Sequence, residues 1–157
     1  MTFSTVKGVW VNIPRLETGK RVLITGASGG ISCETLRLFA QSDAFNGAHY
    51  FTNGDSLSGL IAERSLKAFR IQIFQSDLTT SRSSQDLINA FVAWAGGIDV
   101  LVQLSGGICH PTPWDELTEA ELRADIDLNL TAPLFLAQTI KCIRAIGGKE
   151  ISENKGI

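Results

Sequence analysis

With 157 residues, 44% of them hydrophobic and 19% charged, the chain has the length and composition of one ordered globular domain. Its formal net charge of −2, without any cluster of lysine and arginine, argues against a nucleic-acid partner. No apolar run approaches the ~18 residues that span a bilayer, and Met1 opens no basic-then-apolar leader, so we expect no membrane partner. Three widely spaced cysteines indicate reduced thiols and a cytoplasmic location.

The predicted elements alternate between strand and helix from Lys20 onward, after residues 1–18, which are either an amino-terminal arm or an edge strand. Apolar or alternating runs predict four strands, at Val22–Thr25, Ala48–Thr52, Phe69–Gln75 and Val100–Leu104. Apolar residues at helical spacing predict helices at 30–41, 56–66, 83–95 and, with a break near Asn129–Pro133, 118–146. Asn46 and Gly47 are expected to form the turn into the second strand.

This alternation predicts the fold class. Strands separated by helices of roughly 10–15 residues imply right-handed crossovers and a parallel sheet. The pattern contains no internal repeat and no low-complexity tract. We therefore expect one doubly wound α/β domain over residues 19–157.

The segment Val22–Ser32 carries the strongest chemical signal in the chain. An apolar run leads into a glycine-rich turn, and the turn opens an amphipathic helix. Gly26 and Gly30 allow the backbone to bend and to approach a ligand closely, because neither has a Cβ. The N–H groups at the start of the helix can then hold a pyrophosphate. The alternative interpretation is a tight strand-to-helix turn without a ligand.

Three other positions fall where a dinucleotide needs them. Asp77 and Leu78 follow the third strand, where a carboxylate and a backbone amide can meet the edge of an adenine. Ser105 and Gly106 follow the fourth strand, where the backbone can approach a ribose. The second strand ends about 20 residues beyond the glycine turn, at Thr52–Gly54, where the adenosine ribose would lie.

Four motifs carry a resemblance to a known family. Thr25–Ser32 matches T-G-x-x-x-G-x-G except at the last glycine, and Asp77–Thr79 matches D-[VL]-[TS]. Asp99–Gly106 matches the frame of D-x-L-V-N-N-A-G, and Asp127–Thr131 matches the segment that holds a catalytic asparagine. From about residue 19 to 149 the chain resembles the amino-terminal part of a short-chain dehydrogenase/reductase, especially the 3-oxoacyl-(acyl-carrier-protein) reductase type.

The resemblance implies a Rossmann-type sheet of about five strands in the order 3-2-1-4-5, truncated relative to the family, with the fifth strand aligned on Gly148–Lys155. It implies a nicotinamide cofactor held by nine residues: Gly26, Ser28, Gly30, Ile31, Asn53, Asp77, Leu78, Ser105 and Gly106. Neutral Thr52 and Asn53 would not repel a 2′-phosphate, so NADP is slightly favoured over NAD. Ser32 replaces the third glycine of the motif, where a small residue is still expected to fit.

The residues for catalysis are incomplete in this sequence. The family moves a proton through a tyrosine with a lysine four residues later, whereas the single tyrosine here, Tyr50, is followed by Gly54 at that spacing. Asn129 is the one candidate catalytic residue, and its alternative role is to satisfy backbone groups at a helix break. Cys109 and His110 have no partners at metal-ligand spacing, so we expect a loop and no metal site.

Three functions remain open. The first is a nicotinamide-binding member of a carbonyl/alcohol oxidoreductase lineage that is catalytically incomplete as given. The second is a non-catalytic nucleotide-binding or interaction subunit, which pairs with a complete partner or a second copy through the strongly apolar helix around 131–146. The third is a flavodoxin-like protein that shares only the doubly wound fold.

Overall fold

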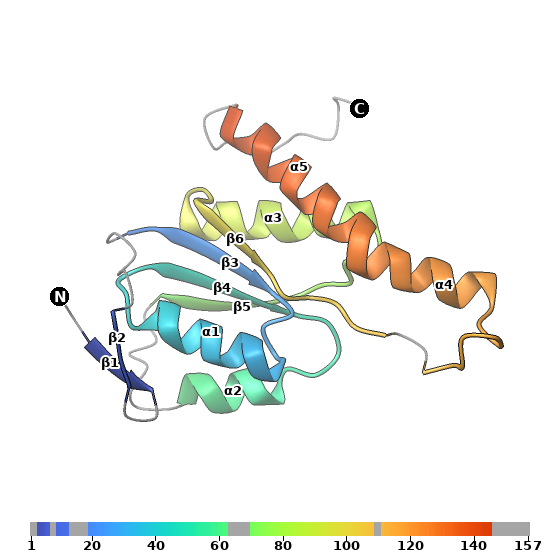
Figure 1. Ribbon diagram of the computed structural model, residues 1–157. Coiled ribbons are helices and arrows are strands. Elements are labelled where there is room, and N and C mark those ends of the chain that lie inside the picture. Colours follow the sequence, from blue (N-terminus) through green and yellow to red (C-terminus); the bar gives the residue numbers. More distant parts are fainter. Residues whose placement is uncertain (1–2, 7–8, 13–18, 63–69, 109–110, 146–157) are drawn as a thin grey trace.

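The computed structural model describes residues 3–6, 9–12, 19–62, 70–108 and 111–145 (Figure 1). Its main body is a four-stranded sheet covered by helices on both faces. The strands of this sheet are β3 (Arg21–Thr25), β4 (Phe45–Tyr50), β5 (Ile71–Gln75) and β6 (Val100–Gln103). The helices are α1 (Gly30–Ala40), α2 (Asp55–Ala62), α3 (Ser81–Ala95), α4 (Glu119–Ile126), the π-helical turn η1 (Asp127–Thr131) and α5 (Ala132–Ala145).

The sheet is parallel throughout, in the order β5-β4-β3-β6. Ile24 of β3 lies opposite Ala48 of β4 on one side and Val102 of β6 on the other. This order confirms the predicted 3-2-1-4 arrangement of a doubly wound fold. The fifth strand, predicted at Gly148–Lys155, lies outside the described residues. Near the amino terminus, β1 (Phe3–Val6) and β2 (Val9–Asn12) form a separate antiparallel pair.

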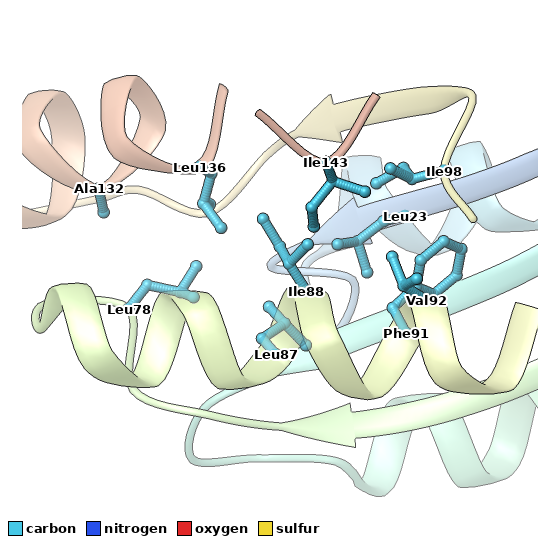
Figure 2. Packing of buried hydrophobic residues seen from close by; sticks show 10 residues of the cluster. All are labelled: Leu23, Leu78, Leu87, Ile88, Phe91, Val92, Ile98, Ala132, Leu136 and Ile143. Carbon is cyan, nitrogen blue, oxygen red and sulfur yellow. The ribbon is translucent and has the colours of Figure 1, made fainter. Parts of the chain in front are cut away.

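Each face of the sheet has its own apolar cluster. Alternation along β3 directs Val22 and Ile24 to a cluster with residues of α1 and α2, and Leu23 to the opposite cluster. Figure 2 shows the second cluster, in which α5 and α3 meet over the sheet. Its buried members are Leu23, Leu78, Leu87, Ile88, Phe91, Val92, Ile98, Ala132, Leu136 and Ile143.

The predicted start of the second strand was wrong by three residues. Asn46 and Gly47 do not form a turn but lie inside β4, which begins at Phe45. A Cβ on Gly47 would stand 2.5 Å from a ring carbon of Phe91, so the glycine admits the aromatic ring of α3 against the sheet. The Asn46 amide donates to the carbonyl oxygen of Ala44, 3.0 Å away. Packing across the sheet thus overrides a dipeptide that ordinarily favours a turn.

The helix ends follow the expected chemistry. Thr118 and Glu121 form a reciprocal capping box at the start of α4, as the sequence predicts. Thr80 caps α3, which ends at Gly96 with φ +78°. The predicted break of the last helix is the π-helical turn at Asp127–Thr131, so α4, η1 and α5 run on from one another (Figure 1). This wider turn ends two residues before Pro133, which has no N–H to donate.

The amino ends of β3 and β6 are held together by an ion pair. The Arg21 guanidinium donates to both carboxylate oxygens of Asp99 at 2.8 Å. The hydrogen bonds and charge of Arg21 lower the pKa of Asp99 to about 2, and Asp99 in turn raises the pKa of Arg21. The pair lies at the opposite edge of the sheet from the carboxyl ends of the strands, so it belongs to the framework and not to the cavity described next.

Candidate functional site

The carboxyl ends of the four parallel strands surround a cavity of about 330 Å³, a size typical of a small-molecule site. Its lining comes from the glycine turn, from the ends of β4, β5 and β6, and from η1: Gly26, Ser28, Gly29, His49, Phe51, Thr52, Asp77, Leu78, Thr79, Leu104, Ser105, Gly106 and Leu128. Six of the nine predicted cofactor residues are in this lining. Gly30, Ile31 and Asn53 are not.

Gly26 is required by the protein's own backbone. Its φ of +64° is a left-handed conformation, and a Cβ would lie 2.7 Å from the backbone nitrogen of Ser105 and 2.8 Å from the carbonyl oxygen of Leu104. The Thr25 hydroxyl accepts from the N–H groups of Leu104 and Ser105, both at 3.3 Å. The glycine turn therefore packs directly on the end of β6, whereas the sequence analysis expected its close approach to be toward a ligand.

The start of α1 is open. Its N-cap, Gly29, provides no side-chain hydrogen bond, and a Cβ on Gly30 would meet no atom within 4 Å. The first N–H groups of a helix have no partner within the helix, so this terminus can hold an anion. Ile31 is exposed, while Ser32, in place of the third glycine, is only 3% exposed. A serine thus fits the buried position, and even a Cβ added to Gly29 would stand 3.5 Å from its hydroxyl.

His49 was not among the predicted site residues. The ring is buried at the end of β4, with Nδ1 3.2 Å from the Gly26 nitrogen and Nε2 2.9 Å from the Ser76 carbonyl oxygen. Burial lowers the pKa of His49, although the bond to Ser76 and the charge of Asp77 oppose that shift. The sequence signal for His49 is its place at the carboxyl end of a buried strand. Because the predicted strand started at Ala48, His49 was placed near the amino end of that strand instead.

The end of β4 also differs from the prediction around Asn53. Phe51 and Thr52 line the cavity, whereas the Asn53 side chain accepts from the N–H of Asp55 at the start of α2. Asn53 is exposed and serves this local turn. The Tyr50 hydroxyl donates to the Gln75 side chain on the neighbouring strand, 3.3 Å away.

Asp77 is the only charged side chain among the described lining residues. One of its carboxylate oxygens accepts from the N–H and the hydroxyl of Thr79, at 2.9 and 2.8 Å. These bonds fix the loop that follows β5. Because no lysine or arginine is in the described lining, phosphate charge at this site has to be met by backbone N–H groups.

Asn129 connects η1 to the loop after β6. Its amide oxygen accepts from the N–H of Gly107 at 3.0 Å, and its amide nitrogen donates to the carbonyl oxygens of Gly107 and Asp125 at 2.7 and 2.8 Å. A Cβ on Gly106 would lie 2.8 Å from the Asn129 oxygen. Both amide hydrogens are therefore engaged with backbone, and the side chain holds the wall of the cavity beside Leu128.

The part of the chain that the structure describes contains no group of three or more histidine, cysteine or acidic side chains that could hold a metal ion. Among the same residues, no helix is both long and apolar enough to cross a bilayer. The Cys109–His110 pair lies outside the described residues. In the whole sequence the single tyrosine is Tyr50, whose hydroxyl bonds to Gln75.

Comparisons with known proteins agree with this geometry. A family model described as short chain dehydrogenase matches residues 20–149. The short chain dehydrogenase/reductase AacuD of Aspergillus aculeatus is 27% identical over 134 residues, which cover 85% of this chain and 46% of that protein. The chain spans about half the length of the curated relatives that it matches.

Two solved structures share the fold. An NADH-dependent reductase, A1-R′, complexed with NAD has a TM-score of 0.70 at 26% identity, with 85% of this chain and 57% of that chain covered. A short chain dehydrogenase from Burkholderia cenocepacia in complex with NADP has a TM-score of 0.72 at 23% identity, with 80% and 51% covered. The second of these supports the fold alone.

Proposed function

Because the chain belongs to the short-chain dehydrogenase family, we propose that it binds a nicotinamide dinucleotide in the cavity at the carboxyl ends of its strands. The observation that carries the proposal is the open amino end of α1, which adjoins a cavity edged by the ends of all four parallel strands. The family assignment argues against the flavodoxin-like alternative. The NAD complex of the reductase that is 26% identical supports a nicotinamide cofactor over a flavin.

Each part of the cofactor has a matching feature in the site. The pyrophosphate fits the amino end of α1, where Gly30 leaves open space in front of the helix. The adenine fits beside Asp77 and Leu78, and the nicotinamide ribose fits beside Ser105 and Gly106. When bound, the nicotinamide would supply the hydride acceptor or donor, while these residues hold and orient it.

The sequence analysis slightly favours NADP because Thr52 and Asn53 are neutral. Thr52 lines the cavity, which supports tolerance of a 2′-phosphate. However, the described lining provides no lysine or arginine to pair with that phosphate, and it includes Asp77. We therefore propose that both cofactors bind, with NADP preferred by less than about ten-fold in affinity.

We further propose that these 157 residues bind cofactor without efficient hydride transfer. The lineage interconverts carbonyl and alcohol groups, and the resemblance assigns the proton transfer to a tyrosine–lysine pair. Tyr50, the sole tyrosine of the sequence, bonds to Gln75, and Gly54 stands where the lysine of such a pair would follow. Asn129 is retained as the candidate catalytic residue of this proposal, although its amide is engaged with Gly107 and Asp125.

A second candidate function is that of a nucleotide-binding subunit that pairs with another chain. Four large apolar side chains recur every four residues along α4, η1 and α5, and each is 44–63% exposed: Leu122, Ile126, Leu130 and Leu134. This apolar stripe extends the predicted contact helix at 131–146 toward its amino end. An exposed row of this kind is typical of an interaction surface, and we propose a homo-oligomer or a family partner as its occupant.

Calorimetric titration of the purified chain with NAD⁺, NADP⁺ and FMN tests the cofactor proposal. We expect one saturable site for each dinucleotide and none for FMN, whereas a preference for FMN would contradict the proposal. Assays with NADPH and NADH on oxoacyl substrates test the catalytic part, and robust turnover by this chain would refute it. Light scattering of the protein as it elutes from a sizing column tests the second candidate function. A monomer that captures no family partner would contradict it.

A further inference from the structure

His49 is a buried polar residue whose contacts span the cavity wall. It is 2% exposed and lies between the glycine turn and the end of β5. The Gly26 N–H can only donate to Nδ1, and the Ser76 carbonyl can only accept from Nε2. Nδ1 must therefore be bare and Nε2 must carry the hydrogen. The neutral imidazole with its hydrogen on Nε2 is the one form that satisfies both contacts.

The backbone of His49 holds the same turn a second time. Its carbonyl oxygen accepts from the N–H of Ala27 at 2.7 Å, so two successive N–H groups of the turn are bound by one residue. The Ser76 N–H donates to the carbonyl oxygen of Tyr50, which follows His49 in β4. Because the hydroxyl of Thr25, next to Gly26, accepts from the Ser105 N–H, a shift of this turn would also displace the end of β6.

We propose that neutral His49 is the positioning residue that sets the glycine turn for the dinucleotide, and that its protonation releases the turn. This inference rests on the proposed function. A protonated ring would direct an N–H from Nδ1 at the Gly26 N–H, and two donors cannot share a hydrogen bond. Either the ring or the turn must then move. The turn leads directly into α1, whose amino end is the proposed pyrophosphate site.

The charges around His49 set the direction of the pH dependence. The turn packed against it contributes Gly26 and Ala27, which carry no charge, and the end of β5 contributes Asp77. Desolvation dominates and lowers the pKa of His49 below its ordinary 6.5, against the opposing effects of Ser76 and Asp77. The ring is therefore neutral at pH 7. The hydrogen bond from the Gly26 N–H to the ring is present above the pKa of His49 and is lost as the pH falls below that pKa.

Two variants separate the contacts of the ring. His49→Asn keeps an acceptor near the place of Nδ1 but does not titrate, whereas His49→Gln keeps a donor near the place of Nε2 and loses the acceptor for Gly26. We expect His49→Gln to weaken NAD⁺ binding by about three- to ten-fold at pH 8, and His49→Asn to restore most of it. Tyr50→Phe is the matched control on the same strand, because it removes only the bond to Gln75. It should bind as the wild type does.

The pH dependence of NAD⁺ affinity distinguishes this role from a merely structural one, which would not change with the protonation of His49. NAD⁺ titrations from pH 8 to about 4.5, with the fold monitored by circular dichroism, should show wild-type affinity constant near neutrality. Below the pKa of His49 the affinity should fall toward about ten-fold per pH unit, and His49→Asn should remove this dependence. Asp77→Asn should move the wild-type midpoint to lower pH, because the carboxylate raises the pKa of His49.

Nuclear magnetic resonance of the free protein tests the role of His49 without cofactor. In the free protein the Gly26 amide proton resonance should follow the titration of His49, and the ring nitrogens should report hydrogen on Nε2. Two results would overturn the role of His49 while leaving the proposed function intact. One is equal NAD⁺ affinity of His49→Gln and wild type at pH 8. The other is the same loss of NAD⁺ affinity at low pH in His49→Asn as in wild type. If the wild type binds no NAD⁺ or NADP⁺ at pH 8, the proposed function falls. If the Gly26 amide proton resonance then does not change as His49 titrates, the proposed positioning of the turn by His49 is overturned as well.

Discussion

Alanine substitution at the two glycines of the phosphate turn should have opposite consequences. Gly26 and Gly30 belong to one sequence motif, but their surroundings differ. At Gly26 the backbone has φ +64°, and a Cβ would stand 2.7–2.8 Å from backbone atoms of Leu104 and Ser105. At Gly30 a Cβ would meet nothing within 4 Å. Gly26→Ala is therefore expected to damage the fold, and Gly30→Ala is expected to damage the ligand site.

The magnitude for Gly26→Ala follows from two costs. A left-handed conformation costs an alanine about 1–2 kcal/mol, and overlap with backbone that cannot move aside costs about 1–3 kcal/mol. We expect the free energy of unfolding to fall by about 2–5 kcal/mol, which for a chain of this length lowers the Tm by about 4–20 °C. For Gly30→Ala we expect the free energy of unfolding to stay constant or to rise by less than about 1 kcal/mol.

Thermal unfolding and NAD⁺ titration of both variants decide between these expectations. Gly30→Ala should unfold at or above the wild-type temperature but bind NAD⁺ at least about ten-fold more weakly, because its methyl group occupies the space before the helix. A Gly26→Ala protein as stable as the wild type would refute the steric argument. A stable Gly30→Ala protein with unchanged affinity would refute the assignment of the pyrophosphate to this helix end.

Three other predictions follow from framework and surface contacts. Asp99→Asn should lower the free energy of unfolding at pH 7 by about 1–2 kcal/mol in urea titrations. Because pairing with Arg21 lowers the pKa of Asp99 to about 2, that stability should be present above pH 4 and lost between pH 4 and 2 in the wild type, and the variant should lack this loss. Asn129→Ala should lower the Tm and weaken NAD⁺ binding, since it frees the loop after β6; unchanged values would oppose the structural role. A double change of Ile126 and Leu130 to glutamate should yield a folded monomer by light scattering if the apolar stripe is an oligomer contact.

The fold was largely predictable because hydrophobic periodicity sets both the element types and their order. The capping box at Thr118 and Glu121 and the buried strand at β3 followed from local signals, whereas the strand order was implied by the family resemblance. The start of β4 was not predictable in this way. Asn46 and Gly47 lie inside the strand because the ring of Phe91 needs the space, and that contact joins residues 44 positions apart. A local turn preference carries no information about such packing.

The site was predictable where a residue acts through its place in a motif. Asp77 and Ser105 each stand two residues beyond the end of a strand, so their arrival at one edge of the sheet followed from parallel topology. His49 and Phe51 were missed because their place in the site depends on which residue ends β4. The predicted strand, Ala48–Thr52, starts three residues late and ends two residues late. Asn53 was predicted to bind the cofactor from the end of the same strand, and that role stays a prediction. In the structure its side chain accepts from the N–H of Asp55 at the start of α2.

Cofactor binding and hydride transfer can be tested separately in this chain. Every described group that lines the cavity comes from residues 26–128. The walls are joined by hydrogen bonds between side chains and backbone. Thr25 bridges to the end of β6, His49 joins the glycine turn to β5, and Asn129 ties the next loop to η1. These bonds hold the pocket in shape without a tyrosine–lysine pair. A measured affinity for NAD⁺ tests this geometry directly, and it does so whether or not the same molecule transfers a hydride.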